Sequence, residues 1–283
     1  MAIPDAGTSS IDEAFVQAFK SNVIHLSAQH PSRLRSCVDS MTVKAETANV
    51  ERIGTKEAVE KTSRHTVTPI LDVPHDRRKF GMSDFQWSDL IDEEDEIRML
   101  ISPKSEYART AGWAMNRQFD RLIIAAASGD STDGEGVAVP LPAGQKIAAG
   151  AGGMSMAKVI EAKEILDANE VDAGNRYMVV NSKAMSDMLG LTEITSSDFN
   201  SVKALVRGEF DTWLGFKWVQ TELLDAGKML AFHKSGIRLG VGRDVTTRID
   251  KRPDVSYATQ VYLAFTAGCT RVEEEKVVEI GVV

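Results

Sequence analysis

The residues that most often carry out chemistry are scattered along this sequence. No two histidines have the i, i+4 spacing with which two imidazoles on one helix share a zinc ion, and none belongs to an H-E-x-x-H motif. The sequence therefore predicts no metal site and no catalytic histidine. The five histidines are His25, His30, His65, His75 and His233.

The two cysteines are weak candidates for a nucleophile. Cys37 follows Arg33 and Arg35, and cationic neighbours can lower the pKa of a thiol. We expect its segment to be extended and exposed, with no base partner. Cys269 follows Gly268 in a strand-like stretch and is predicted to be a small core residue. Two widely spaced cysteines argue against a disulfide scaffold or a zinc knuckle and favour a reducing compartment.

Two glycine clusters were tested as phosphate loops. The run Gly150-Ala-Gly-Gly-Met-Ser155 precedes a predicted helix, but serine replaces the third glycine of G-x-G-x-x-G and no clear strand precedes it. Gly240-Val-Gly242 also lacks the third glycine, and no G-x-x-x-x-G-K-[ST] occurs. We interpret both clusters as turns or flexible loops. The weaker alternative is a soluble phosphate-binding α/β enzyme that uses the Gly150–Ser155 loop. We assign no catalytic residue, cofactor or metal.

Two short charged runs of opposite sign remain. The first is Arg77-Arg78-Lys79, and the second is the carboxylate run from Asp92 to Glu96. One interpretation is a local salt link within the subunit. The other is a contact that sets the register between neighbouring copies, and the sequence leaves both open. The predicted candidates for a subunit interface are Arg64, Arg77, Arg78, Lys79, Asp92, Glu93, Glu94, Asp95, Glu96, Phe15 and Phe19.

The two phenylalanines belong to an amphipathic helix predicted near the N-terminus. Ser10 and Glu13 make a capping-box pattern, and His30-Pro31 ends the run. The helix packs either on its own domain or on a neighbouring subunit, and both alternatives stay open. Its apolar face consists of Ile11, Phe15, Phe19 and Leu26.

Residues 36–85 are predicted to form a long, polar, two-stranded loop that projects from the rest of the fold. Short extended stretches lie around Val50–Ile53 and His65–Val73, and a turn lies at Gly54. Pro69 and Pro74 fit only an edge strand or a position outside a sheet. An isolated hairpin of this kind is only marginally stable in water unless another surface covers it. The pattern therefore indicates a partner that covers this loop.

The clearest predicted element is a helix over residues 103–128. Ser102 is its expected N-cap, Pro103 its first residue and Gly129 its stop. A helix of about 25 residues is about 38 Å long. One face carries Tyr107, Ala111, Met115, Phe119, Leu122, Ile123 and Ala126.

The remaining pattern predicts an α+β fold with antiparallel strands toward the C-terminus. A loop rich in glycine over 129–153 precedes a mixed middle region. Helices are predicted over 155–167, 182–190 and about 198–208, and strands over 176–181, 215–220, 229–232, 237–239, 245–249, 257–265 and 276–280. In the strand that begins at Tyr257, one face would carry Tyr257, Thr259, Val261, Leu263 and Phe265.

Composition excludes several classes of protein. The 283 residues are 43% hydrophobic and 26% charged, with a formal net charge of −8. This balance is unlike that of a disordered or collagen-like chain. The acidic total argues against a protein that coats nucleic acid by charge. No apolar run approaches the ~20 residues needed to cross a bilayer, and Met1–Ser10 shows no pattern of a secretion signal.

Several short segments, taken in their order along the chain, resemble the major capsid protein of tailed bacteriophages, of the short-tailed-phage type. Each segment by itself is weakly specific for this family, and the ordered set of segments is much more specific. The segments are His65–Pro69, Arg77-Arg78, Trp87–Asp92, Ile97–Leu100, Ser102–Tyr107, Ala114–Arg117, Phe119-Asp120, Ile123–Gly129, Gly240–Val245, Tyr257–Val261, Gly268–Arg271 and Lys276–Ile280.

The resemblance implies the shell fold that tailed phages share with the floor of herpesvirus capsids. Its implied parts are an N-terminal arm over residues 1–45, an extended loop (the E-loop) over 46–85, a peripheral domain over 86–154 and 228–283 with the spine helix 103–128, and an axial domain over 155–227. The implied function is a structural subunit, not an enzyme, that self-assembles into an icosahedral shell around double-stranded DNA.

The resemblance also implies partners. These are further copies of the chain in hexameric and pentameric capsomers, a scaffolding protein, a portal and in some cases a cement protein. The DNA would be enclosed without sequence-specific binding, and no membrane is involved. The location would be the virion capsid, assembled in the host cytoplasm. A nanocompartment (encapsulin-like) shell subunit is the nearest alternative.

Overall fold

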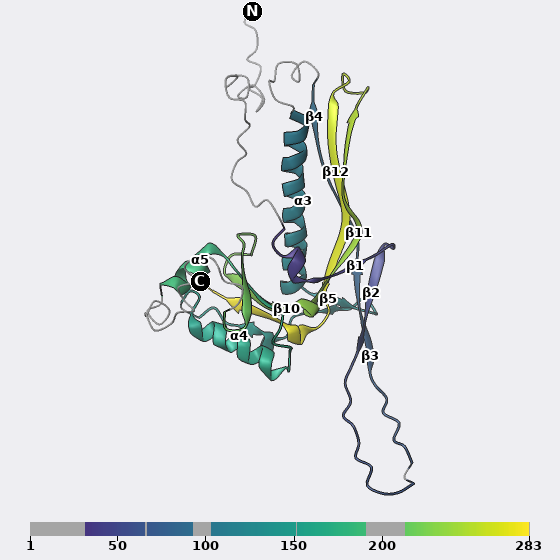
Figure 1. The fold of residues 1–283 in the computed structure, drawn as a ribbon, viewed down its shortest axis with the longest axis vertical. Coiled ribbons are helices and arrows are strands. Elements are labelled where there is room, and N and C mark those ends of the chain that lie inside the picture. The colour runs from purple at the N-terminus through teal and green to yellow at the C-terminus, as the bar shows by residue number, and fades with distance from the viewer. Residues whose placement is uncertain (1–31, 66, 93–102, 151, 191–212, 283) are drawn as a thin grey trace, which may run out of the picture. The chain divides into compact units, whose positions relative to one another are not determined.

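The structure is a computed structural model that describes residues 32–65, 67–92, 103–150, 152–190 and 213–282 (Figure 1). The chain forms two compact units. Of the described residues, the first unit combines 32, 84–92, 103–118 and 243–267, and the second combines 33–65, 67–83, 119–150, 152–190, 213–242 and 268–282. The mixture of helices and strands confirms the predicted α+β class.

Helix α3 (Pro103–Ser128) occupies the range that the sequence predicts. Its buried positions recur at every fourth residue from Ala111 to Ala127, as expected for one face of a long helix. Leu122, predicted on this face, is only half-buried, because the buried stripe continues through Ile123 and Ile124. The helix ends where the Gly129 N–H donates to the Ala125 carbonyl at 2.9 Å.

The first unit contains β4 (Ser83–Ile91), the first part of α3 and the outer parts of β11 (Ile237–Lys251) and β12 (Thr259–Arg271). Phe85 on β4 stacks on Phe265 of β12 with ring centroids 5.0 Å apart. Thr266 donates a hydrogen bond to Asp84 across the same two strands. The predicted inward face of β12 is confirmed for its members from Thr259 to Phe265.

Tyr257 does not belong to that face. It lies before β12 in the turn after β11, with a φ of 59°, and 60% of its surface is exposed. The left-handed backbone interrupts the alternation that a strand would impose, so the period-two pattern does not extend to this residue. The sequence also predicted two separate strands where β11 is one continuous strand of 15 residues.

The core of the second unit is a five-stranded sheet with the order β7-β13-β10-β8-β9. Helix α4 (Met156–Ala168) packs on β13, and Val159, Ala162 and Leu166 of α4 are fully buried in the same apolar core as β8, β10 and β13. The strands are β7 (Lys146–Ile147), β8 (Arg176–Val180), β9 (Phe216–Gln220), β10 (Lys228–His233) and β13 (Val277–Gly281).

Helix α5 (Ser182–Leu189) begins one residue earlier than a cap at Ser182 would place it. Asn181, not Ser182, is the N-cap, because its side-chain oxygen accepts from the Ala184 N–H at 2.7 Å. Both residue types cap helices well, so the pattern alone does not separate them. The helix predicted over about 198–208 lies outside the described residues.

Two further sheets complete the fold. One has the order β1-β11-β12-β4, with β1 (Asp39–Thr42) parallel to β11. The other has the order β2-β3-β5-β6, formed by β2 (Thr47–Ile53), β3 (His75–Gly81), β5 (Ser131–Asp133) and β6 (Ala138–Val139). Both lie near a small apolar cluster of Val43, Ala48 and Phe80.

Gly240 lies inside β11 and not in a turn, which corrects the interpretation of the second glycine cluster. A Cβ atom at Gly240 would lie 2.6 Å from a ring carbon of Phe80, and one at Gly268 would lie 2.2 Å from the Gly81 carbonyl. These glycines are therefore required for close packing of β11 and β12 against Phe80, not for a ligand.

The segment before β1 is fixed by a buried carboxylate. Asp120 of α3 accepts hydrogen bonds from the Arg33 and Leu34 N–H groups at 3.0 and 3.1 Å. The Arg35 guanidinium lies over the Phe119 ring, 4.7 Å from its centroid. These contacts place the short 3₁₀ turn Arg35–Cys37 beside the spine helix.

His233 makes the stability of the second unit depend on pH. Burial, and next the charge of Lys276, lower the pKa of His233 from its ordinary value of 6.5, and its Nδ1 accepts from the Ser235 N–H at 3.2 Å. The unfolded chain therefore binds the proton more readily than the folded chain. The stability that the neutral imidazole provides is present above pH 6.5 and is lost as the pH falls through this value.

We expect a lower melting temperature at pH 5.5 than at pH 7.5. The difference in melting temperature should be smaller in His233→Asn, which keeps a hydrogen-bond acceptor. Equal falls in both proteins would contradict this.

Candidate subunit interface

The described residues offer no catalytic centre. They contain no group of three or more histidine, cysteine or carboxylate side chains that could hold a metal ion. No described helix is both long and apolar enough to span a bilayer. Cys37 is buried, not exposed as predicted, and desolvation raises the pKa of its thiol despite the nearby arginines. Burial also raises the pKa of Cys269, to about 12.

The Gly150–Ser155 loop does not form a phosphate cradle. A cradle needs converging N–H groups, whereas here carbonyl oxygens converge on a cation. The Lys158 ammonium donates to the carbonyls of Ala149, Gly152, Gly153 and Gly281 at 2.7, 3.1, 3.0 and 2.9 Å. Lys158 therefore joins the loop to the end of β13, and its ammonium protons are directed at these carbonyls and not at a ligand.

Removing this ammonium should destabilise the fold. In Lys158→Met the four carbonyls lose a shared donor, and we expect a loss of about 1–3 kcal/mol in the free energy of unfolding. Urea denaturation measures the loss. Lys163→Met on the same helix is the matched control, since Lys163 is partly buried like Lys158 and lies outside the carbonyl cluster. Equal effects of the two substitutions would show that the carbonyl cluster contributes nothing.

A long loop leaves β2 and β3, and it is fixed at its root. The two strands pair antiparallel from Thr47 opposite Gly81 to Ile53 opposite His75. The Gly54 N–H then donates to the Pro74 carbonyl at 2.9 Å. A Cβ atom at Gly54 would lie 2.6 Å from the Pro74 ring, so glycine is needed for this closure.

A buried carboxylate ties the root to the C-terminal segment. Glu274 Oε1 accepts from Arg78 at 2.9 Å, and Glu274 Oε2 accepts from Arg52 at 3.1 Å. Arg271 Nε lies 3.9 Å from Glu274 Oε1, and the Ser131 hydroxyl donates to the same oxygen at 3.4 Å. The side chains of Glu274 and Arg78 are only 7% and 6% exposed. We call Glu274 with Arg52, Arg78 and Arg271 the root clamp.

Arg271 extends the root clamp to the end of α3. Its guanidinium is fully buried and donates to the carbonyls of Ala127, Gly129 and Val139. Burial lowers the pKa of Arg271, and the charge of Glu274 opposes this. A cation at the last carbonyls of a helix is also favoured by the helix dipole. The C-terminal segment thus holds the end of the spine helix and the root of the loop together.

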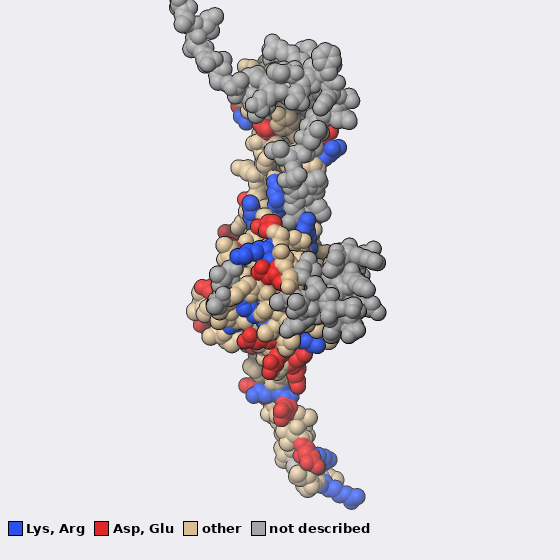
Figure 2. Space-filling model, turned by 90° about the vertical axis from the view of Figure 1, so that its left-hand side faces the viewer, with Lys and Arg blue, Asp and Glu red and all other residues tan. Residues whose placement is uncertain are grey.

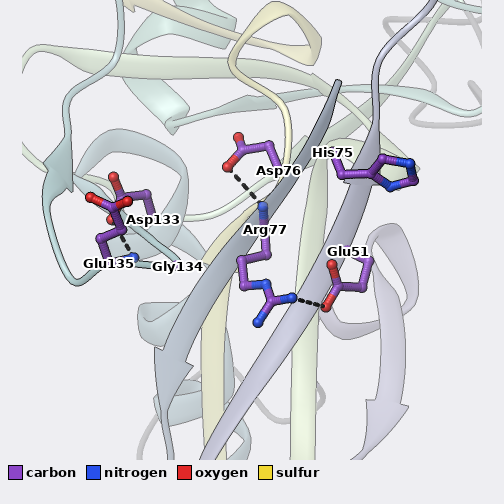
Figure 3. Close-up of a pocket in the computed structure, with 7 residues that line it drawn as sticks. All are labelled: Glu51, His75, Asp76, Arg77, Asp133, Gly134 and Glu135. Carbon is purple, nitrogen blue, oxygen red and sulfur yellow. Dashed lines mark hydrogen bonds and ion pairs between the residues drawn. The ribbon is translucent and has the colours of Figure 1, made fainter. Parts of the chain in front are cut away.

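A half-open pocket of about 360 Å³ lies at the same root (Figure 3). Arg77 crosses it and pairs with Glu51 at 3.4 Å, while Asp133 and Glu135 stand on the opposite turn. The Asp133 carboxylate accepts from the N–H groups of Glu135 and Val137, which shapes that turn. The pocket presents more carboxylates than cations and holds no arrangement suited to catalysis. Its lining residues are Glu51, His75, Asp76, Arg77, Asp133, Gly134 and Glu135.

Beyond its root, the loop over residues 54–74 is exposed. It extends past the ends of β2 and β3 (Figure 1), and charged side chains of both signs project from it (Figure 2). His65, with a φ of 57°, sits at its far turn. Large apolar side chains on it are also exposed, namely Val59, Val67, Ile70 and Leu71. These exposed apolar groups make the loop a candidate interaction surface.

The predicted interface residues differ in their exposure. Arg64, Lys79 and Asp92 are exposed, and Arg77 is half-exposed in its pair with Glu51. Arg78 is not available for such a contact, because its guanidinium is buried against Glu274. Among the described residues, the carboxylates that pair with Arg77 and Arg78 come from positions 51, 76 and 274. The remaining candidates lie outside the described residues: Glu93, Glu94, Asp95, Glu96, Phe15 and Phe19.

Sequence reasoning missed the root clamp. Glu274 lies in the run Glu273–Glu275, which has the pattern of a solvated acidic turn. The available signal was Arg271, a charge at the end of an otherwise apolar strand, since such a charge needs a partner when buried. The pattern does not say which carboxylate that partner is.

Comparisons with known proteins agree with this structure. The chain matches a family model described as phage capsid protein over residues 11–283. No curated protein matches it in sequence. Among solved structures, it is similar to the capsid of cyanophage P-SCSP1u, with 17% identity, a TM-score of 0.75 and coverage of 100% of this chain and 97% of that one.

Two further solved structures show the same fold. Mycobacterium phage Che8 gives 16% identity and a TM-score of 0.72, covering 92% of this chain and 95% of that one. The capsid of a native GTA particle gives 12% identity and a TM-score of 0.71, covering 99% of this chain and 100% of that one.

Proposed function

The chain belongs to the phage capsid protein family, and we propose that its loop 54–74 lies over a neighbouring copy in a shell that encloses double-stranded DNA. The protein is a structural subunit of an icosahedral bacteriophage capsid and not an enzyme, and its fold is that of tailed-phage major capsid proteins. Such shells are assembled from repeated copies of one subunit and form part of the virion.

The loop assignment rests on the contrast between the root of the loop, which is fixed, and the residues beyond the root, which are exposed. The root is held by a buried ion cluster and by the Gly54–Pro74 hydrogen bond, whereas residues beyond it expose apolar side chains. A loop that served only its own subunit would gain by covering those groups. A neighbouring copy supplies the missing cover.

The remaining parts follow from family membership as proposals. We assign residues 1–45 to an arm, 46–85 to the E-loop, 86–154 and 228–283 to a peripheral domain, and 155–227 to an axial domain. Rings of six and five copies assemble in the host cytoplasm with a scaffolding protein and a portal, and a cement protein is an optional addition. The net charge of −8 supports a shell that admits DNA without gripping it.

Electron microscopy of the expressed chain tests this function. We expect closed shells from the chain alone or together with its scaffolding protein. Purified shells that contain DNA after infection, with the chain as the main coat component, would support the enclosure of DNA. Persistent monomers or small rings under both conditions would overturn the proposal.

Charge reversal at the root should weaken assembly and leave the fold intact. Arg77 is 53% exposed at its side chain, so Arg77→Glu removes a surface charge without opening the core. We expect a higher critical concentration for assembly at low salt and a smaller difference at high salt, because salt screens exposed charges. Lys163→Glu on α4 is the control. An unchanged critical concentration at low salt would remove Arg77 from the interface.

A further inference from the structure

The two limbs of the exposed loop differ in chemistry. The outbound limb, residues 55–64, carries five charged side chains, at Lys56, Glu57, Glu60, Lys61 and Arg64. The return limb, residues 67–74, carries one charge, at Asp72. The rest of the return limb is mainly apolar. The two limbs therefore offer a neighbour two unlike surfaces.

The return limb holds the most exposed large apolar side chains in the described residues. Ile70 is 96% exposed and Val67 is 89% exposed, and Leu71 is also exposed. Burying apolar surface yields about 25 cal/mol per Å², and Val67 and Ile70 obtain little of that within their own subunit. The outbound limb has one such side chain, Val59, among charged neighbours that are well solvated.

The return limb is poorly suited to bind as an added β-strand. Pro69 and Pro74 have no N–H group, so they cannot donate to a ladder. Between Gly54 and Pro74, the described residues lie in no strand. The root bond from the Gly54 N–H to the Pro74 carbonyl uses one more backbone group. A contact made by this limb must therefore rest on its side chains.

We propose that the return limb is the face of the loop that packs on an apolar surface of a second copy, while the outbound limb faces water. This rests on the proposed function, in which the loop lies over a neighbour. The second copy is the occupant because a capsid is built from repeated copies, so that each loop meets another copy of its own chain. Val67 and Ile70 carry the contact by apolar burial, and the charges of the outbound limb keep the opposite face solvated.

Protection of single cysteines during assembly tests this assignment. Ile70→Cys and Glu57→Cys place one thiol on each limb, at exposed positions. The parent protein, labelled in parallel, gives the background of the two native thiols, of which Cys37 is buried and Cys269 is partly buried. Each variant is treated with a maleimide before and after shell assembly. We expect loss of labelling at position 70 in shells and unchanged labelling at position 57.

The outcomes separate this inference from the proposed function. Protection at position 57 alone, or equal protection at both positions, would overturn the inference and leave the loop contact standing. Labelling of both positions in complete shells would overturn the inference and the loop contact together. If Ile70→Cys prevents assembly while Glu57→Cys assembles, the inference is supported, and Val67→Cys then supplies the protection measurement. Failure of both variants to assemble, with native unfolding curves, would overturn the assignment to one limb.

Discussion

Replacing Glu274 by glutamine should lower the free energy of unfolding by about 3–5 kcal/mol, as expected when one partner of a buried ion pair is removed. The carboxylate faces the guanidinium groups of Arg52 and Arg78 at 3.1 and 2.9 Å, with Arg271 slightly farther away. A neutral amide of the same size leaves these cations close together, with the half-exposed Asp76, 3.6 Å from Arg78 and 3.8 Å from Arg52, as their remaining counter-charge. Urea denaturation followed by circular dichroism measures the loss.

Glu275→Gln is the matched control for this substitution. Glu275 is the next residue and is exposed, so the same chemical change should alter the stability by far less. The variant Glu274→Asp keeps the charge and shortens the side chain, and we expect it to retain part of the stability. A Glu274→Gln protein as stable as its Glu275→Gln counterpart would show that the root clamp contributes no net stabilisation.

Deleting residues 56–66 should abolish shell formation and leave a folded subunit. The deleted residues lie beyond the Gly54–Pro74 hydrogen bond, and the described ones among them are exposed. Shortening the closed loop from residues 55–73 to the remaining eight lowers its closure entropy cost by about 0.8 kcal/mol. We therefore expect a melting temperature at or slightly above that of the parent, with no closed particles by electron microscopy.

A length-matched variant separates the reach of the loop from its chemistry. Residues 56–66 replaced by glycine and serine keep the full length and leave the return limb intact. We expect partial assembly from this variant and none from the deletion. Normal shells from the deletion would show that the far part of the loop has no part in assembly.

The sequence predicts the elements that have a strong local pattern. Helix α3 is predicted over its full range, because Pro103 and Gly129 mark its ends and apolar residues recur at helical spacing between them. β8 and β9 are predicted for the same reason, as short apolar or alternating runs. The resemblance to tailed-phage capsid proteins is confirmed by the family match over residues 11–283.

What the sequence does not predict depends on residues far apart in the chain. Arg78 looks like one of three adjacent surface cations, and its burial follows from Glu274, 196 residues away. Cys37 looks exposed because its neighbours are charged, yet Asp120 fixes the adjacent backbone against the spine helix. No local pattern encodes these pairings. The exposed loop was foreseen for a related reason, since its polar segment has too little apolar material to fold by itself.

The four carbonyls around Lys158 have a consequence for the particle outside the cell. An oxygen cage of this kind can also be filled by a free monovalent ion, which leaves when the medium is diluted. Here the cation is the ammonium group of Lys158, which is covalently part of the chain. It therefore cannot dissociate from the carbonyls into the medium. The junction between the glycine-rich loop and the end of β13 should therefore keep its strength when a virion is diluted into a medium of low salt.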